Sequence, residues 1–303
     1  MLHDTGAGHP ERPARLAAVL SRLEASGLVA QLEREESPAA SLDALLRVHP
    51  ADYVQRVEAR IAQGATWVDT PDANVGPRSF EAALGAAGAA LHAVNRIATG
   101  VWRRAFVVAR PPGHHAEESL AMGFCLFNNA AIAARAAQAL PGIERVAIVD
   151  FDVHHGNGTQ HIFERDPTVF YASLHQFPHY PGTGAASERG RGLGEGFTLN
   201  CPQAPGTGDR DWLTAFDDLV LPALDAFRPS WVIVSAGFDA HRLDPLSDTV
   251  VTEAAFAHMT RGLVEVSERH ADGRILSLLE GGYSLEGLAR SSEAHVSALL
   301  GSG

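Results

Sequence analysis

Short apolar segments rich in valine, isoleucine and leucine recur along the chain, each separated from the next by a stretch with helical periodicity. Continuous apolar runs are typical of strands that are buried on both faces of a sheet. Strands that alternate with helices predict a parallel sheet with helices on both sides, and no linker or repeat divides the chain. We therefore expect one α/β domain over residues 1–303. The predicted strands are residues 105–109, 146–149, 168–174, 197–200, 231–235 and 275–279.

Helices are predicted between these strands and ahead of the first one. Pro13 suits a first helical position, and Gly27 suits a helix end. The predicted helices are about 13–26, 42–48, 51–62, 78–98, 128–140, 211–227, 253–269 and 285–300. A fold of this kind usually begins with a strand, whereas this chain opens in a loop. Either the first strand is absent or it lies upstream of the given sequence.

Composition excludes several classes of protein. No apolar run approaches the roughly 20 residues that span a membrane, and the start M-L-H-D-T-G lacks the features of a secretory signal. The formal charge of -12 argues against nucleic acid as a partner. The two cysteines, Cys125 and Cys201, do not make a disulfide framework. A cytoplasmic location is therefore expected.

The segment D-F-D-V-H-H-G-N-G, which begins at residue 150, predicts a metal site. Asp150, Asp152 and His154 alternate, so an extended chain presents all three on one face. Ligands of parallel sheets gather beyond the carboxyl ends of the strands, where Asp239 also lies. Asp152, His154 and Asp239 would leave a fourth position open for water, as in catalytic zinc sites. A solvated polar strand end is the alternative for one cluster alone, but their convergence favours a metal.

Two further strand ends carry groups suited to acid–base chemistry. His114 and His115 follow R-P-P-G, and adjacent imidazoles beside a metal suit proton transfer near neutral pH. Asp150 and Asn157 are available to accept from the second ring nitrogens. Tyr283, in E-G-G-Y, could donate to a developing oxyanion. Taken singly, these residues would be interpreted as packing or surface side chains.

The ordered set of motifs resembles the zinc-dependent histone deacetylase family, and in particular its class II-type bacterial members. The motifs are R-P-P-G-H-H-A, G-F-C-L-F-N-N, D-F-D-V-H-H-G-N-G-T, S-L-H-Q-F, A-G-F-D-A-H-R-L-D-P-L and L-E-G-G-Y. The resemblance runs from H-P-E-R-P to the final predicted helix. It implies the arginase/deacetylase fold, a three-layer α/β/α domain with a mostly parallel sheet of eight strands.

The resemblance also implies a role for each matching residue. Zinc would be bound by Asp152, His154 and Asp239. His114 and His115 would be the acid–base pair, oriented by Asp150 and Asn157, and Tyr283 would stabilise the oxyanion. Asn157 stands where some relatives have aspartate, which should lower the basicity of His115. The implied substrate tunnel comprises Gly123, Phe124, Tyr180, Leu246 and Gly282.

Structural potassium ions are implied as well. The first site would use Asp150, Ser173 and Leu174, together with the backbone of Asp152 and His154. A second site would use Phe163, Asp166, Val169 and Phe197. Arg12 is a candidate either for guiding the released acid or for a salt bridge.

The expected activity is hydrolysis of acetyl or related acyl groups from acyl-lysine or a similar amide. One alternative is an acetylpolyamine amidohydrolase, although Leu246 stands where polyamine-preferring relatives carry an acidic residue. Another, from a different class, is a non-catalytic acyl-lysine-binding protein. Arginase-like chemistry with two manganese ions is disfavoured, because Gly156 and His241 stand where acids would be needed. The physiological substrate, the acyl chain length and the oligomeric state stay open.

Overall fold

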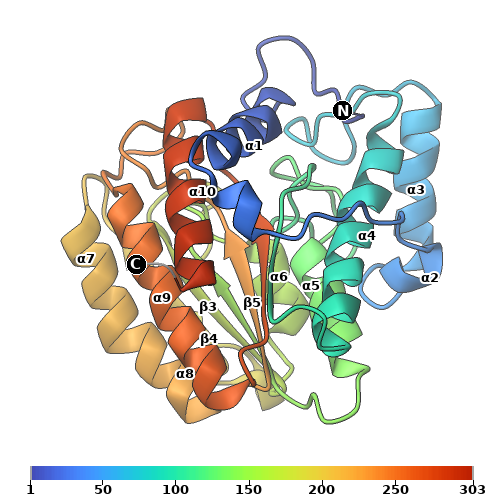
Figure 1. The fold of residues 1–303 in the computed structure, drawn as a ribbon. Helices are drawn as coiled ribbons and strands as arrows, with labels where there is room; N and C mark the ends of the chain where they lie inside the picture. The colour runs from blue at the N-terminus through green and yellow to red at the C-terminus, as the bar shows by residue number, and fades with distance from the viewer. Residues whose placement is uncertain (1, 302–303) are drawn as a thin grey trace.

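The computed structural model describes residues 2–301, which form a central parallel sheet between two layers of helices (Figure 1). Every pairing between neighbouring strands is parallel, in the order β1-β6-β5-β2-β3-β4. The predicted fold class is thereby confirmed, and each predicted strand coincides with an observed one. The strands are β1 Arg104–Val107, β2 Val146–Asp150, β3 Val169–Gln176, β4 Thr198–Gln203, β5 Trp231–Ala236 and β6 Ile275–Leu279.

The sheet has six strands within residues 2–301, where the family resemblance implied eight. Residues 31–37 line a groove of about 760 Å³ together with the outer edge of β1, but they do not join the sheet. This segment is rich in charge, and its side chains turn to other partners. Glu33 accepts a hydrogen bond from Trp102, and Glu35 binds Arg96. The edge strand β1 therefore pairs only with β6 in the described chain.

Alternate residues of the strands face the two helical layers, as continuous burial requires. Ala147 and Val149 belong to a core that includes α1, α8, α9 and α10. Val146 and Ile148 point the other way, into a core with α4 and α5. Figure 1 shows these layers on opposite sides of the sheet. The bounds are α1 Ala14–Ala25, α4 Ser79–Ala98, α5 Asn129–Gln138, α8 Leu221–Phe227, α9 Glu253–His270 and α10 Leu285–Leu300.

The remaining helices are short or lie outside these layers. The predicted helix at 211–227 is interrupted by a π-helical turn, Phe216–Val220, just ahead of Pro222, because proline cannot continue a regular α-helical ladder. Helix α6 was not predicted, since G-N-G indicated a turn. The bounds are α2 Leu42–Leu45, α3 Ala51–Ala62, α6 Asn157–Phe163 and α7 Asp209–Ala215, with 3-10 turns at Leu28–Gln31 and Gly192–Gly194.

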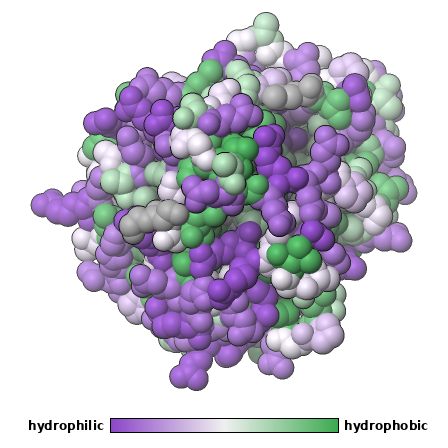
Figure 2. All heavy atoms as spheres, in the orientation of Figure 1, coloured by the Kyte–Doolittle hydropathy of each residue, from purple (hydrophilic) through white to green (hydrophobic). Residues whose placement is uncertain are grey.

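The outer surface is dominated by polar groups. Figure 2 shows hydrophilic side chains over most of the face seen in Figure 1, with smaller hydrophobic patches between them. Within residues 2–301, no helix has both the length and the apolar character needed to cross a membrane. The apolar side chains are instead concentrated in the cores against the sheet.

Candidate active site

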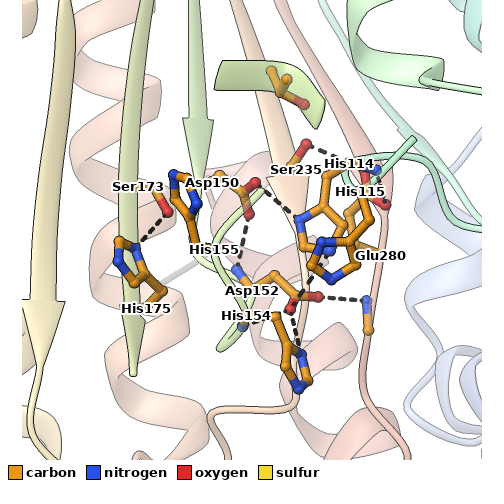
Figure 3. A network of polar contacts seen from close by, with 12 residues as sticks. His114, His115, Asp150, Asp152, His154, His155, Ser173, His175, Ser235 and Glu280 are labelled. Atoms are coloured by element: carbon orange, nitrogen blue, oxygen red, sulfur yellow. Dashed lines mark hydrogen bonds and ion pairs between the residues drawn. The ribbon is translucent and has the colours of Figure 1, made fainter. Parts of the chain in front are cut away.

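The polar segments that follow β1, β2, β5 and β6 meet at one edge of the sheet. Strands β6, β5 and β2 are neighbours, so their carboxyl ends deliver side chains to the same place. Figure 3 shows His114, Asp150, Asp152 and His154 turned toward one another, with Glu280 beside them. Four separate stretches of sequence therefore build one buried polar cluster.

Three side chains in this cluster are arranged as metal ligands would be. Asp152, His154 and Asp239 are buried and each offers a ligand atom, and these atoms all lie within 4.8 Å of one another. The His154 Nδ1 lies 3.1 Å from an oxygen of Asp152 and 3.1 Å from an oxygen of Asp239. Two buried carboxylates and a buried imidazole at this spacing are a donor set that suits zinc.

Backbone groups orient the two carboxylates. Asp152 accepts from the Gly281 N–H at 2.7 Å, and Asp239 accepts from the Val153 N–H at 2.8 Å. A side chain at Gly237 or Gly281 would collide with the carboxylates, so glycine is required at both positions. The residues that would hold a metal are thus fixed before any ion binds.

The tandem histidines lie against this cluster with their ring centroids 4.0 Å apart. His114 Nδ1 donates to Asp150 at 3.0 Å, and His115 Nδ1 lies 2.8 Å from Asn157 Oδ1. Burial by itself lowers the pKa of His114, but the carboxylates of Asp152 and Asp150 outweigh it and raise that pKa well above its usual value. Burial, assisted by His114 and His154, lowers the pKa of His115 well below its usual value. The two rings therefore favour opposite protonation states.

Aromatic side chains line the approach to the histidines. Phe124 packs edge-on against Tyr283, with centroids 5.8 Å apart, and Tyr180 packs edge-on against His115 at 5.1 Å. Gly123 and Phe124 both have positive φ. A Cβ at Gly123 would collide with the His115 ring, so this turn needs glycine.

The other two residues of the predicted tunnel lie in neighbouring loops. The Leu246 carbonyl accepts from His179 at 2.9 Å, and the Gly282 carbonyl accepts from Arg15 at 2.6 Å. His179 in turn stacks on the ring of His154, with centroids 5.0 Å apart. Each predicted tunnel residue therefore lies beside His115, His154 or Tyr283, either directly or through one neighbouring residue.

The residues predicted for potassium fall into two groups. Asp150 and Ser173 are register partners in β2 and β3, and Leu174 follows Ser173. Asp150 also accepts from the Tyr171 hydroxyl at 3.1 Å. The second group lies at the turn from α6 to β3, where the Asp166 N–H donates to the Phe163 carbonyl and the Val169 N–H to the Asp166 carbonyl; the Phe197 carbonyl accepts from Tyr171. Both potassium sites stay predictions.

Residues 9–299 match the histone deacetylase domain family. The chain belongs to this family. It is 44% identical over 281 residues to a histone deacetylase-like amidohydrolase of Pseudomonas aeruginosa, covering 92% of this chain and 73% of that protein. It is 41% identical to a probable deacetylase of Archaeoglobus fulgidus, covering 94% of this chain and 79% of that protein. The crystal structure of the HDA15 HD domain superimposes with a TM-score of 0.93 at 42% identity, covering 99% of this chain and 85% of that one.

Two residues of this candidate site were missed by the sequence interpretation. Glu280 is buried at the end of β6 and accepts from the Gly113 N–H at 2.7 Å and from the Ser235 hydroxyl at 3.2 Å. Burial raises the pKa of Glu280 to about 7. Its position in E-G-G-Y, immediately after an apolar strand, could have indicated a buried carboxylate with partners, because acidic side chains are rarely fully buried unless they are paired.

Arg15 is the second, and it corrects the emphasis on Arg12. The Arg12 side chain is exposed, whereas Arg15 is fully buried and lies with its guanidinium 5.0 Å from the Tyr283 ring centroid. Arg15 shares one face of α1 with Val19 and Leu23. An arginine at i in an i, i+4, i+8 apolar stripe could have indicated a buried, paired cation.

Proposed function

We propose that this protein is a zinc-dependent amidohydrolase that removes acetyl or related acyl groups from acyl-lysine or a similar amide. The observation that supports it most is the buried Asp152–His154–Asp239 cluster with His114 and His115 packed against it. Zinc bound there would polarise the acyl carbonyl and acidify a water molecule. Family membership adds weight to this interpretation, since the relatives are described as deacetylases and an amidohydrolase.

The chain's own groups supply the proton transfers in this proposal. His115, with its lowered pKa, is the neutral base that takes a proton from water. The Tyr283 hydroxyl donates a hydrogen bond to the oxyanion of the tetrahedral adduct. A protonated histidine of the tandem pair then donates to the leaving amine. His114, whose pKa the two aspartates raise, is held in its orientation by Asp150.

One observation favours the alternative of a polyamine substrate. Leu246 is not acidic, but Asp72 brings a carboxylate to the tunnel wall from another loop and accepts from the Tyr180 hydroxyl at 2.7 Å. A carboxylate beside an exposed tunnel residue would favour a cationic substrate.

A substrate panel on the zinc-loaded protein tests the proposal. It would comprise acetyl-lysine peptides, longer acyl-lysines and acetylated polyamines, with zinc content measured in parallel. We expect hydrolysis of at least one class, and we expect Tyr283→Phe to lower kcat by about 10²–10³, the usual loss for one oxyanion donor. Tyr283→Phe should still bind zinc. A protein that binds no zinc and hydrolyses none of these amides would contradict the proposal, and wild-type turnover in Tyr283→Phe would contradict the role of the tyrosine.

A further inference from the structure

The amide of Asn157 connects the buried ring of His115 to a carboxylate nearer the surface. Its Oδ1 lies 2.8 Å from His115 Nδ1, and its Nδ2 lies 2.5 Å from Glu117 Oε1. Asn157 is the first residue of α6 and is 2% exposed, whereas the Glu117 side chain is 19% exposed. Glu117 therefore lies two steps from the imidazole and outside its immediate shell.

The neighbours of Asn157 determine which way its amide must face. A carboxylate only accepts hydrogen bonds, so Glu117 requires the NH₂ end of the amide. The other atoms on that side are acceptors too, namely the His115 carbonyl at 3.5 Å and the Met122 sulfur at 3.4 Å. The amide oxygen is left to face His115 Nδ1. A flipped amide would set its oxygen against the carboxylate.

This orientation in turn selects the tautomer of His115. An amide oxygen is an acceptor, so a neutral His115 must carry its proton on Nδ1. The lone pair is then on Nε2, the nitrogen on the other side of the ring from Asn157. An imidazole that serves as a base needs this nitrogen unprotonated. Hydrogen bonds thus connect Glu117 through the Asn157 amide to the His115 ring.

We propose that Glu117 is a positioning residue that fixes the tautomer of His115 by holding the Asn157 amide in one orientation. The catalytic consequence rests on the proposed hydrolase function, whereas the tautomer does not. An amide does not readily pass a proton along, so Glu117 acts through geometry rather than as a proton conduit. An aspartate at position 157 would place a carboxylate directly against His115. Here the carboxylate belongs to Glu117, and the Asn157 amide stands between it and the ring.

His161 holds Glu117 from the solvent side. The His161 Nδ1 lies 2.7 Å and 2.9 Å from the two carboxylate oxygens, at the edge of a surface hollow of about 770 Å³. The hydrogen bond to Glu117 raises the pKa of His161, although partial burial opposes it. Because Glu117 contacts the Asn157 amide directly and His161 contacts only Glu117, His161 should be less important than Glu117 for the tautomer.

The tautomer can be measured directly by ¹⁵N NMR of histidine-labelled, zinc-loaded protein, with His115→Gln to assign the signals. In the wild type we expect a protonated-type Nδ1 and an unprotonated-type Nε2 for His115. In Glu117→Gln the replacement amide can donate or accept, so we expect averaged or exchanged His115 shifts. We also expect kcat to fall about 10–100-fold, the usual range for such supporting partners, with KM within about twofold of wild type.

Three matched variants separate this effect from a general loss of structure. Glu118→Gln neutralises the adjacent, exposed acid and should leave both readouts unchanged. His161→Gln should keep the His115 signature. The Asn157→Asp, Glu117→Gln double variant exchanges amide and carboxylate, and it should restore the signature because the aspartate accepts directly from His115 Nδ1.

Unchanged His115 shifts in Glu117→Gln would overturn the proposal, whatever the effect on kcat. So would a double variant that fails to restore the signature while it remains folded. The NMR readout needs no turnover. If the protein hydrolysed none of the tested amides, the positioning role would still be tested independently of the proposed function.

Discussion

Arg15 shows how one buried side chain ties the start of the chain to the site at its far end. Its guanidinium donates to the carbonyls of Gly282 and Glu280, on either side of the turn that leads to Tyr283. It also pairs with Glu11 at 3.1 Å, and Arg110 binds the same carboxylate. The stability of such a buried charge network requires every partner, because removing one leaves an unpaired charge away from water, which costs free energy.

Replacing Arg15 should therefore be far more harmful than replacing its exposed neighbour Arg12. We expect Arg15→Met to lower the free energy of unfolding by about 3–5 kcal/mol, since it breaks a buried ion pair and leaves two carbonyls without their donor. Arg12→Met should stay within about 0.5 kcal/mol of wild type. Denaturant unfolding of both variants measures this. A difference below about 1 kcal/mol between them would show that the buried pairing contributes little.

At the scale of elements, His295 joins two helices to the sheet. It lies in α10, and its ring nitrogens lie 2.7 Å from the Thr260 hydroxyl of α9 and 2.8 Å from the Ser277 hydroxyl of β6. The ring is fully buried among Phe106, Phe151 and Phe238. Burial lowers the pKa of His295 to about 3. The neutral imidazole is therefore the form that the packed helices accommodate.

This shift predicts a loss of stability in mild acid. The pKa of His295 is about 3 when folded and near 6.5 when unfolded, so the unfolded chain binds the extra proton. Its contribution is complete above about pH 6.5 and is lost as the pH falls toward 3, at up to about 1.4 kcal/mol per pH unit. His295→Gln should be less stable at pH 7.5 but should have a shallower slope between pH 6.5 and 4. Equal slopes in the wild type and in His295→Gln would refute the assignment.

At the scale of the whole molecule, the site lies where both helical layers and the sheet converge. The two cores share strands β2 and β5, so neither layer has a sheet of its own. The candidate ligands stand at the ends of these same two strands. Binding a metal there should consequently stabilise the whole fold rather than one part of it. The single domain predicted for residues 1–303 leads to the same expectation.

Zinc should shift one cooperative thermal transition. At 100 times its Kd, zinc should add about 2.7 kcal/mol to the free energy of unfolding, provided that it does not bind the unfolded chain. Asp239→Asn should abolish most of this increment while stabilising the metal-free protein, because it removes one of two carboxylates buried together. Calorimetry with and without zinc measures both effects. Two separate transitions, of which only one responds to zinc, would contradict the single domain.

Local patterns determined much of this protein. The apolar runs predicted all six strands, because a strand that is buried on both faces is apolar at nearly every position. The D-x-D-x-H alternation and the tandem histidines identified the side chains that the structure brings together, because the carboxyl ends of parallel strands share one edge. Helix α6 was not predicted because it begins with Asn157 and Gly158, and both residue types ordinarily indicate a loop.

The tertiary structure alone decided which supporting residues reach the site. Arg15 and Gly282 are 267 positions apart, and no pattern within either segment indicates their contact. Likewise, only packing places Glu117 on the Asn157 amide and separates the buried Arg15 from the exposed Arg12. Periodicity reports which face of an element is buried, whereas a hydrogen bond between distant segments depends on how the layers are assembled. The candidate site residues can therefore be predicted from the sequence, whereas the residues that orient them are determined by the fold.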